Sequence, residues 1–287
     1  MQALARHGFA VEVLCGARFD LDQEIDLAAW LAERGHAFEM VQGTSWTADA
    51  RGVRSDIPPH FRLEVRGVPI TLHHSPTTRP HQPEGSEHEQ FLALFHATLD
   101  RFRPEILVTY GGSRLARAVL AHARAQGLAT VFNLHNLQYH RLEPFRDVDV
   151  VRVPSHFAAE HYRQTLGLRC RVLSNLVDAE RVRVERPEPR YVTFVNPSAE
   201  KGVYVFARIA DELGRRRPEI PLLVVEGRGT EATLAACGLD LRVHGNVFLM
   251  AHTPDPRRFW RVSRLCLMPS LCGESQGRVA IEAMLNP

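Results

Sequence analysis

Along most of the chain, short apolar runs alternate with longer segments in which apolar residues recur every three or four positions. The apolar runs are typical of buried strands, and the periodic segments are typical of amphipathic helices. In the first half of the chain the expected strands are 9–15, 37–42, 105–110, 129–135, 150–155 and 170–175. The expected helices are 21–35, 89–102, 113–127 and 155–167. Apolar strands that alternate with helices predict an α/β fold with helices on both faces of a parallel sheet.

Three local patterns refine this picture. Residues 62–74 predict a hairpin that turns at Arg66-Gly67, and residues 77–89 have no periodicity and predict a surface loop. Ser113 and Ser155 each precede a helical segment. Because a serine oxygen at that position accepts a hydrogen bond from the first turn, we expect both to be N-caps.

The polar stretch 176–190 interrupts the pattern, which then begins again. The strands expected there are 191–196, 222–227, 247–251 and 265–270, and the helices are 201–217, 230–238, 256–264 and 278–285. The pattern therefore predicts two α/β domains, residues 1–185 and 186–287. The chain opens on the end of a helix with no strand before it and stops directly after a helix. We therefore expect the first strand of the first domain to be missing and the second domain to be truncated.

Composition excludes several classes of protein. The net charge of +2 gives no strong field for nucleic acid. Five cysteines without a CxxC pair are expected to be reduced, and no signal peptide or membrane-spanning apolar run is present, so we expect a cytoplasmic protein. The arginine-rich stretches 181–190 and 215–217 are interpreted as solvated surface. The alternative, a patch that faces anionic lipid on the inner face of a membrane or an anionic substrate, stays open.

The stretch ESQGRVAIEAM, residues 274–284, places two glutamates eight positions apart around the expected start of the last helix. The amides of Gly277, Arg278 and Val279 would carry the unpaired N–H groups and positive dipole of that helix start, which suit a phosphate. Glu274 lies in the preceding loop, and Glu282 lies about one turn inside the helix, where its carboxylate is suited to a ribose diol. The alternative is a helix-terminal charge at Glu274 and a solvated face at Glu282.

Three other loops follow strands. In NPSAEKG, residues 196–202, Lys201 offers a point charge for a diphosphate, although taken alone the stretch favours an ordinary connecting loop with Ser198 as its cap. The loop EGRGT, which contains Gly227, is not a dinucleotide fingerprint. In the first domain Gly111 and Gly112 would let a ligand approach the backbone, and His135 is expected at the same carboxyl edge of the sheet.

Other enzyme classes lack support in the sequence. The histidines show no HExxH pattern, and no GxSxG elbow, P-loop or GxGxxG motif occurs. We therefore expect no metal or other cofactor, and neither a serine hydrolase, a P-loop NTPase nor a nicotinamide dehydrogenase.

Taken in order, these motifs resemble the family-4 retaining glycosyltransferases of the GT-B fold. The resemblance rests on FAVEVLCG, RPEILVTYGG, VPSHF with VLSNLVD, NPSAEKG, NVFLMAHTPD and the two glutamates of ESQGRVAIE, and it covers most of the chain. It implies two Rossmann-like domains that face a cleft, with the acceptor on the first and a nucleotide-sugar donor on the second.

The resemblance also implies roles for individual residues. Lys201 resembles the lysine that contacts the donor diphosphate, Glu274 the glutamate near the sugar hydroxyls, and Glu282 the glutamate that binds the ribose. His135 resembles a histidine near the transferred sugar. Donor contacts are expected from Asn196, Lys201, Gly227, Ser275, Gly277, Arg278, Val279 and Glu282. One departure is Asn196, which stands where the family commonly has an arginine.

The expected function is therefore transfer of a sugar from a nucleotide-sugar donor to an acceptor hydroxyl, with retention of configuration and no metal, in carbohydrate biosynthesis. The alternatives are an inactive truncated GT-B scaffold and a GT-B nucleotide-sugar epimerase. The donor base, the sugar, the acceptor and the oligomeric state are not predicted. A peripheral membrane contact stays open.

Overall fold

The structure is a computed structural model that describes residues 1–19, 23–46 and 55–286. Two compact units are present: residues 1–133 with 142–151 form the first unit, and residues 134–141 with 152–287 form the second. Each unit has its own hydrophobic core. These units are defined by which residues pack together. The division into domains 1–185 and 186–287 stays a prediction.

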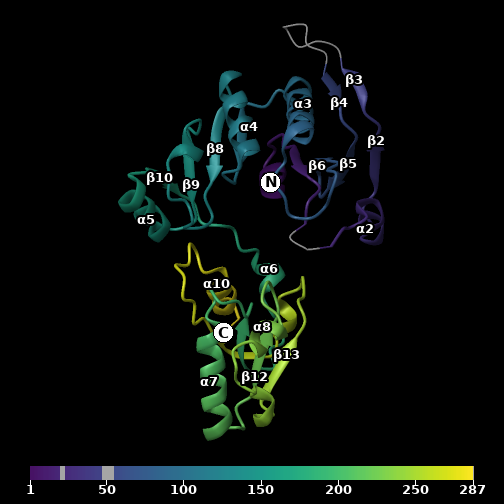
Figure 1. Cartoon of the computed structure of the whole chain (residues 1–287). Helices are drawn as coiled ribbons and strands as arrows, with labels where there is room; N and C mark the ends of the chain where they lie inside the picture. The colour runs from purple at the N-terminus through teal and green to yellow at the C-terminus, as the bar shows by residue number, and fades with distance from the viewer. Residues whose placement is uncertain (20–22, 47–54, 287) are drawn as a thin grey trace. The chain divides into compact units, whose positions relative to one another are not determined.

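The first unit begins with a mixed four-stranded sheet of order β1-β6-β5-β2 (Figure 1). Its strands are β1 (Val13–Gly16), β2 (Phe38–Val41), β5 (His60–Val65) and β6 (Val68–His73), and its helices are α1 (Gln2–Arg6) and α2 (Leu27–Glu33). Strand β1 pairs with β6 in parallel, whereas β5 is antiparallel to both of its neighbours. This sheet is therefore mixed, because the hairpin inserts a strand, β5, that runs antiparallel to its neighbours.

The structure confirms the predicted hairpin. Arg66 and Gly67 both have positive φ, 54° and 76°, as a tight two-residue turn requires. A small antiparallel pair, β3 (Thr44–Trp46) with β4 (Ser55–Ile57), was not predicted. Part of the expected surface loop is helical, since α3 (Gly85–Phe102) begins within residues 77–89.

A second sheet has the order β10-β9-β8-β7. Its strands are β7 (Ile106–Thr109), β8 (Ala129–Asn133), β9 (Val150–Val153) and β10 (Cys170–Val172), with α4 (Arg114–Ala125), the 3₁₀ turn η1 (Glu143–Phe145) and α5 (His156–Leu166) between them. Strands β7 and β8 pair in parallel. Ser113 and Ser155 cap α4 and α5 by accepting hydrogen bonds from Ala116 and Ala158 (both 3.1 Å), which confirms both predicted N-caps.

The second unit contains a wholly parallel sheet of order β13-β12-β11-β14. Its strands are β11 (Tyr191–Val195), β12 (Leu222–Val225), β13 (Val247–Met250) and β14 (Ser263–Leu267). Its helices are α6 (Ala179–Val182), α7 (Val203–Arg216), α8 (Glu231–Ala235), η2 (Leu241–His244), α9 (Arg257–Trp260) and α10 (Arg278–Met284). Helices cover both faces of this sheet. On one face α7, α8 and η2 pack against the sheet in one hydrophobic core, and on the other face α6, α9 and α10 pack against it in a second core.

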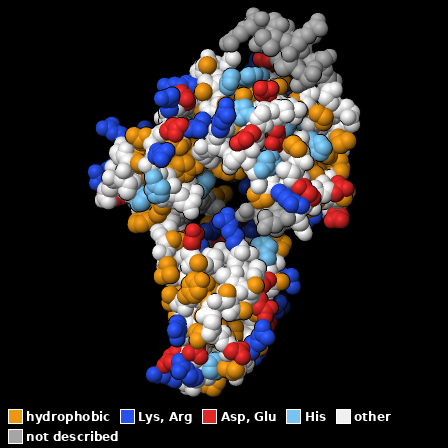
Figure 2. All heavy atoms as spheres, viewed as in Figure 1, with side chains coloured by type: hydrophobic (Ala, Val, Ile, Leu, Met, Phe, Trp, Pro, Cys, Tyr) orange, Lys and Arg blue, Asp and Glu red, His pale blue; other side chains and the backbone are white. Residues whose placement is uncertain are grey.

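Helix α6 corrects the interpretation of the polar stretch 176–190. Val182 is only 2% exposed and packs in the second of these cores, so the stretch 181–190 is not purely solvated surface. The other arginine-rich stretch, 215–217, is neutralised within the chain. Arg215 pairs with Asp211 and Glu212, Arg216 pairs with Glu212, and Figure 2 shows basic and acidic side chains intermixed at this end of α7.

None of the helices in the described residues combines the length and the apolar composition needed to cross a bilayer.

Candidate functional site

Lys201 and Glu274 form an ion pair at the carboxyl edge of the sheet in the second unit. Lys201 lies after β11 and Glu274 after β14, and these strands are parallel neighbours, so their following loops begin side by side. The Lys201 Nζ atom lies 2.6 Å from Glu274 Oε1, and Ser270 Oγ donates to the same oxygen at 2.8 Å. Burial raises the pKa of Glu274, but the hydrogen bonds from Lys201 and Ser270 and the lysine charge outweigh it and lower the pKa below its usual value.

Gly202 allows these two loops to approach each other. Its φ is +84°, and a Cβ atom there would lie only 2.0 Å from the Pro269 carbonyl oxygen. The Leu271 N–H donates to the Glu200 carbonyl at 2.9 Å, and this hydrogen bond also holds the two loops together. The separation of Lys201 and Glu274 therefore depends on a glycine at position 202.

Asn196 joins the loops that follow β11 and β12. Its φ is +62°, and its Oδ1 atom accepts a hydrogen bond from the Gly229 N–H at 3.0 Å. A Cβ atom on Gly227 would lie 3.0 Å from the Asn196 side chain, and one on Gly229 would lie 2.2 Å from the Pro197 carbonyl oxygen. The amide oxygen of Asn196 therefore holds the loop of residues 226–230, and a donor contact from Asn196 and Gly227 stays a prediction.

The loop that carries Glu274 also contacts the segment around His135, which belongs to the same unit. Ser275 Oγ donates to the His135 carbonyl at 2.5 Å, and Ser155 Oγ donates to the Ser275 carbonyl. Gln276 exchanges two hydrogen bonds with the backbone of Asn175, at 3.0 Å and 3.1 Å. The structure thus brings the His135 backbone and Ser275 together by a direct hydrogen bond, and Gln276 and Asn175, which the sequence analysis did not single out, hold the same loop.

The environment of His135 favours the neutral imidazole. Burial lowers its pKa, and the positive charge of Arg152 lowers it further. Arg152 is held by a hydrogen bond from its Nη2 atom to Asn175 Oδ1 at 3.1 Å. A neutral imidazole can both donate and accept a hydrogen bond, as a ligand hydroxyl requires.

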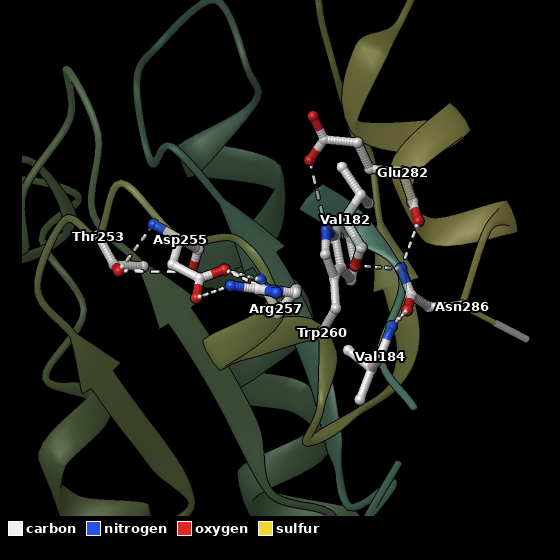
Figure 3. Close-up of polar contacts among 8 residues, drawn as sticks. All are labelled: Val182, Val184, Thr253, Asp255, Arg257, Trp260, Glu282 and Asn286. Carbon is white, nitrogen blue, oxygen red and sulfur yellow. Dashed lines mark hydrogen bonds and ion pairs between the residues drawn. The ribbon is translucent and has the colours of Figure 1, made fainter. Parts of the chain in front are cut away.

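Glu282 is buried within α10, with 6% of its surface exposed, so the interpretation as a solvated face is wrong. Its Oε1 atom accepts from Arg278 Nε at 2.6 Å, and its Oε2 atom accepts from the indole N–H of Trp260 at 3.3 Å. Figure 3 shows the Trp260 ring pointing its nitrogen at this carboxylate. The Arg278 side chain is 68% exposed, so one partner of Glu282 can exchange with a ligand while the other is fixed in the core.

The two ends of α10 are fixed by different means. Gly277 is the N-cap with φ +64°, and the nearest atoms to a Cβ added there would lie 3.9 Å away, so backbone conformation rather than space requires the glycine. The helix's own hydrogen bonds begin at the Ala280 N–H, which leaves the amides of Gly277, Arg278 and Val279 outside that ladder.

At the other end, Asn286 donates to the Val182 and Glu282 carbonyls and accepts from the Val184 N–H at 2.7 Å (Figure 3). Trp260 and Asn286 are not among the predicted residues, because nothing in their local sequence identifies partners 22 and 104 positions away. Ser270 is also not among them, although Glu274 lies only four positions after it.

Gly111 and Gly112 follow β7 in the first unit. Gly111 has φ +88° and open space around its Cα, and the adjacent Tyr110 is 74% exposed. These features suit a loop that a ligand approaches, and the acceptor role of the two glycines stays a prediction.

Comparison with known proteins identifies the family. The model of Glycosyltransferase Family 4 matches residues 25–181, more than half of the chain. No curated protein sequence matches the chain.

Three solved structures have a similar fold. A glycosyltransferase from Rickettsia africae ESF-5 has a TM-score of 0.57 and 12% identity, over 72% of this chain and 63% of that one. HepE from Anabaena has a TM-score of 0.56 and 16% identity, over 77% and 66%. TarM from S. aureus has a TM-score of 0.55 and 12% identity, over 99% and 69%. This chain therefore spans between 63% and 69% of the length of these structures.

The similar structures confirm the α/β architecture expected for the GT-B class. With the family model matching over half of its length, the chain belongs to Glycosyltransferase Family 4.

Proposed function

We propose that this protein transfers a sugar from a nucleotide-sugar donor to an acceptor hydroxyl, with retention of configuration. The observation that carries the proposal is the cluster of Lys201, Glu274 and Ser270 at the carboxyl edge of the parallel sheet in the second unit. Open α/β sheets bind ligands at this edge, and the family membership supplies the class of reaction.

In this proposal Lys201 binds the donor diphosphate. Lys201 is the only lysine in the sequence, because all the other residues among its 35 Lys and Arg are arginines. Its side chain is 31% exposed and already lies beside a carboxylate. A compact ammonium can turn from Glu274 to a phosphate oxygen more readily than a planar guanidinium, and it stabilises the negative charge of the leaving diphosphate.

Glu274 then becomes available for the hydroxyls of the transferred sugar. Its lowered pKa keeps it ionised, so it accepts hydrogen bonds and does not donate them. Ser270 holds the same oxygen in place while Lys201 turns away. Neutral His135, on the neighbouring loop, is proposed to contact the same sugar.

Glu282 is proposed to bind the ribose hydroxyls by exchanging Arg278 for the diol. Trp260 acts as a positioning residue, because its indole N–H keeps Oε2 in a fixed direction. The amides of Gly277, Arg278 and Val279 would supply phosphate contacts beside it. The reaction needs no metal in this scheme, since positive charge and positioned amides carry the stabilisation.

UDP-sugars are the first donors to test. The similar HepE was crystallised with UDP and glucose, and a TarM mutant was crystallised with UDP among other ligands. For the acceptor we propose only that it bears a hydroxyl group. A cytoplasmic location and any membrane contact remain predictions.

The test begins with melting curves of the protein in UDP-, GDP-, ADP- and dTDP-sugars. A donor at 100 times its Kd should stabilise the protein by about 2.7 kcal/mol. Lys201→Met should lower the affinity for that donor by about 10- to 150-fold, which is the loss expected when a charged hydrogen bond of about 1.5–3 kcal/mol is removed. Arg208→Met, an exposed charge on α7, is the matched control and should leave affinity unchanged.

Product analysis then tests the reaction itself. The anomeric proton coupling in the NMR spectrum of the product should show the configuration of the donor sugar. Inversion would contradict retention, and product formed without any acceptor would favour an epimerase. If no nucleotide sugar shifts the melting temperature, the proposal is wrong.

A further inference from the structure

One face of the mixed sheet in the first unit is polar, although helix α3 covers it (Figure 1). Residues directly opposite each other in β5 and β6 lie on the same face, which places Arg62 beside Thr71 and His60 beside His73. The ring of Phe91 on α3 contacts the ring of His73, with 5.8 Å between centroids. The opposite face packs with α2 in a hydrophobic core. Packing alone therefore does not explain the polar side chains under α3.

A cavity of about 380 Å³ is lined from α3 and from β4, β5 and β6. Its lining combines the apolar side chains of Ile57 and Leu94 with the polar side chains of His60, Arg62 and Arg101. Sites for small molecules commonly have volumes of about 300–1,000 Å³ and a similar mixture of apolar walls and a few polar groups. Neither the sequence motifs nor the proposed function uses this cavity.

His60 brings an unused hydrogen-bonding atom to this lining. Its side chain is buried, with 1% exposed, and its Nδ1 atom lies 3.0 Å from the Pro58 carbonyl oxygen. Because a carbonyl only accepts hydrogen bonds, Nδ1 carries the hydrogen. Burial lowers the pKa of His60, so the ring is neutral and Nε2 is an acceptor.

The Nε2 atom of His60 is buried and has no hydrogen-bond partner among the described residues. Since Nδ1 faces the backbone at Pro58, the Nε2 side of the ring is turned away from that backbone. A buried acceptor that lacks a partner lowers stability, and a ligand group that donates to it removes this penalty. The first requirement for a ligand of this cavity is therefore a hydrogen-bond donor.

The charged groups around the cavity favour a neutral ligand. Arg101 forms an ion pair with Glu12, and Arg62 lies opposite Glu39 of β2. Because each guanidinium lies near a carboxylate, the lining has no excess positive charge for a phosphate, and the two guanidinium groups disfavour an amine. Arg62 and Asp100 both line the cavity and form no ion pair with another described residue. They can therefore donate to and accept from a ligand.

We propose that this cavity binds a neutral compound with several hydroxyl groups, such as one sugar unit. One hydroxyl donates to His60 Nε2, others bind Arg62 and Asp100, and the carbon skeleton contacts Ile57 and Leu94. A hydroxyl both donates and accepts, so a polyhydroxylated compound matches a lining that mixes donors and acceptors. The site shares no residue with the Lys201 cluster and lies wholly within the first unit, so it does not depend on the proposed function.

The test measures binding of free glucose, mannose, galactose and N-acetylglucosamine by ligand-observed NMR. A Kd in the millimolar range is expected for a ligand held by a few hydrogen bonds. His60→Asn keeps an N–H near the position of Nδ1 and removes Nε2, so the affinity should fall by about 2- to 12-fold, the loss expected for one hydrogen bond. His60→Gln places an amide oxygen near the position of Nε2 and should retain more of the affinity. Glucose 6-phosphate should bind no better than glucose.

Arg62→Met should lower the affinity by about tenfold or more, because it removes a charged donor. Arg66→Met, an exposed arginine at the turn of the same hairpin, is the matched control and should bind as the wild type does. Because Arg62 is also exposed, its variant should fold even if His60→Asn does not.

Three results would overturn the proposal. They are absence of binding by the wild type at millimolar concentrations of all four sugars, equal affinity in Arg62→Met and Arg66→Met, and tighter binding of glucose 6-phosphate than of glucose. Equal affinity in the wild type and in folded His60→Asn would overturn it as well, because the sugar would then bind elsewhere. Circular dichroism verifies the fold of each variant before its affinity is compared.

Discussion

Replacement of Gly202 by alanine should separate the two loops that form the Lys201–Glu274 pair. The alanine Cβ atom would lie 2.0 Å from the Pro269 carbonyl oxygen and 2.7 Å from its carbon. Relief of this overlap requires a movement of at least about 1 Å, because close-packed interiors do not accept such contacts. Since Lys201 precedes Gly202 and Glu274 follows Pro269 by five positions, the movement separates their charges.

The cost has two parts. The backbone at Gly202 has φ +84°, and a left-handed conformation costs a residue with a side chain about 1–2 kcal/mol. The overlap with Pro269 adds about 1–3 kcal/mol, the usual range for overpacking. Gly238→Ala is the matched control, because Gly238 has φ +74° and nothing within 4 Å of its added Cβ. That variant should lose only the first part, about 1–2 kcal/mol.

The assay compares melting temperature and donor affinity in the two variants. Each kcal/mol lowers the melting temperature by about 2–4 °C in a domain of this size, so Gly202→Ala should melt clearly below Gly238→Ala. Gly202→Ala should also bind donor more weakly, whereas Gly238→Ala should bind it normally. Equal melting temperatures and equal donor affinities in both variants would refute the role of the Pro269 contact.

Three further outcomes are expected. Trp260→Phe removes the indole hydrogen bond to buried Glu282, so the free energy of unfolding in urea should fall by about 1–3 kcal/mol and the donor should bind more weakly. An unchanged free energy and an unchanged donor affinity would show that the bond is not needed. Arg152→Met removes a positive charge beside His135, so the pKa of His135 measured by NMR should rise towards its ordinary value; an unchanged pKa would exclude this interaction. Burial lowers the pKa of His73 as well as that of His135, so the unfolded chain binds protons more readily than the folded one. The melting temperature should therefore fall as the pH drops from about 7 to 5, less steeply in His73→Gln, and an equal slope in wild type and variant would contradict the assignment.

Sequence patterns predicted the elements whose causes are local. The hairpin at Arg66-Gly67 and the caps at Ser113 and Ser155 depend on a few adjacent residues, and all three are present. The parallel sheet of the second unit also follows from its alternating pattern. The start of α3 at Gly85 was missed because its N-cap, Glu84, makes no side-chain capping bond and gives no signal.

Contacts between distant residues could not be predicted in the same way. Spacing placed Glu274 and Glu282 near the start of one helix, but the indole partner of Glu282 lies 22 positions earlier. Asn286 fixes the end of α10 through Val182, which lies 104 positions away in a stretch that looked polar. The contact of Ser275 with the His135 backbone spans 140 positions. Such pairs are set by packing of the whole unit, which no local pattern records.

The most direct test of the proposed donor site uses the single lysine of the chain. An amine-reactive reagent finds one lysine side chain, Lys201, within residues 1–287, and mass spectrometry separates its product from that of the amino terminus. A bound nucleotide sugar should slow modification of Lys201 and leave modification of the amino terminus unchanged, because the diphosphate occupies the lysine. If Lys201 reacts at the same rate with and without a saturating nucleotide sugar, the central assignment of this site is contradicted.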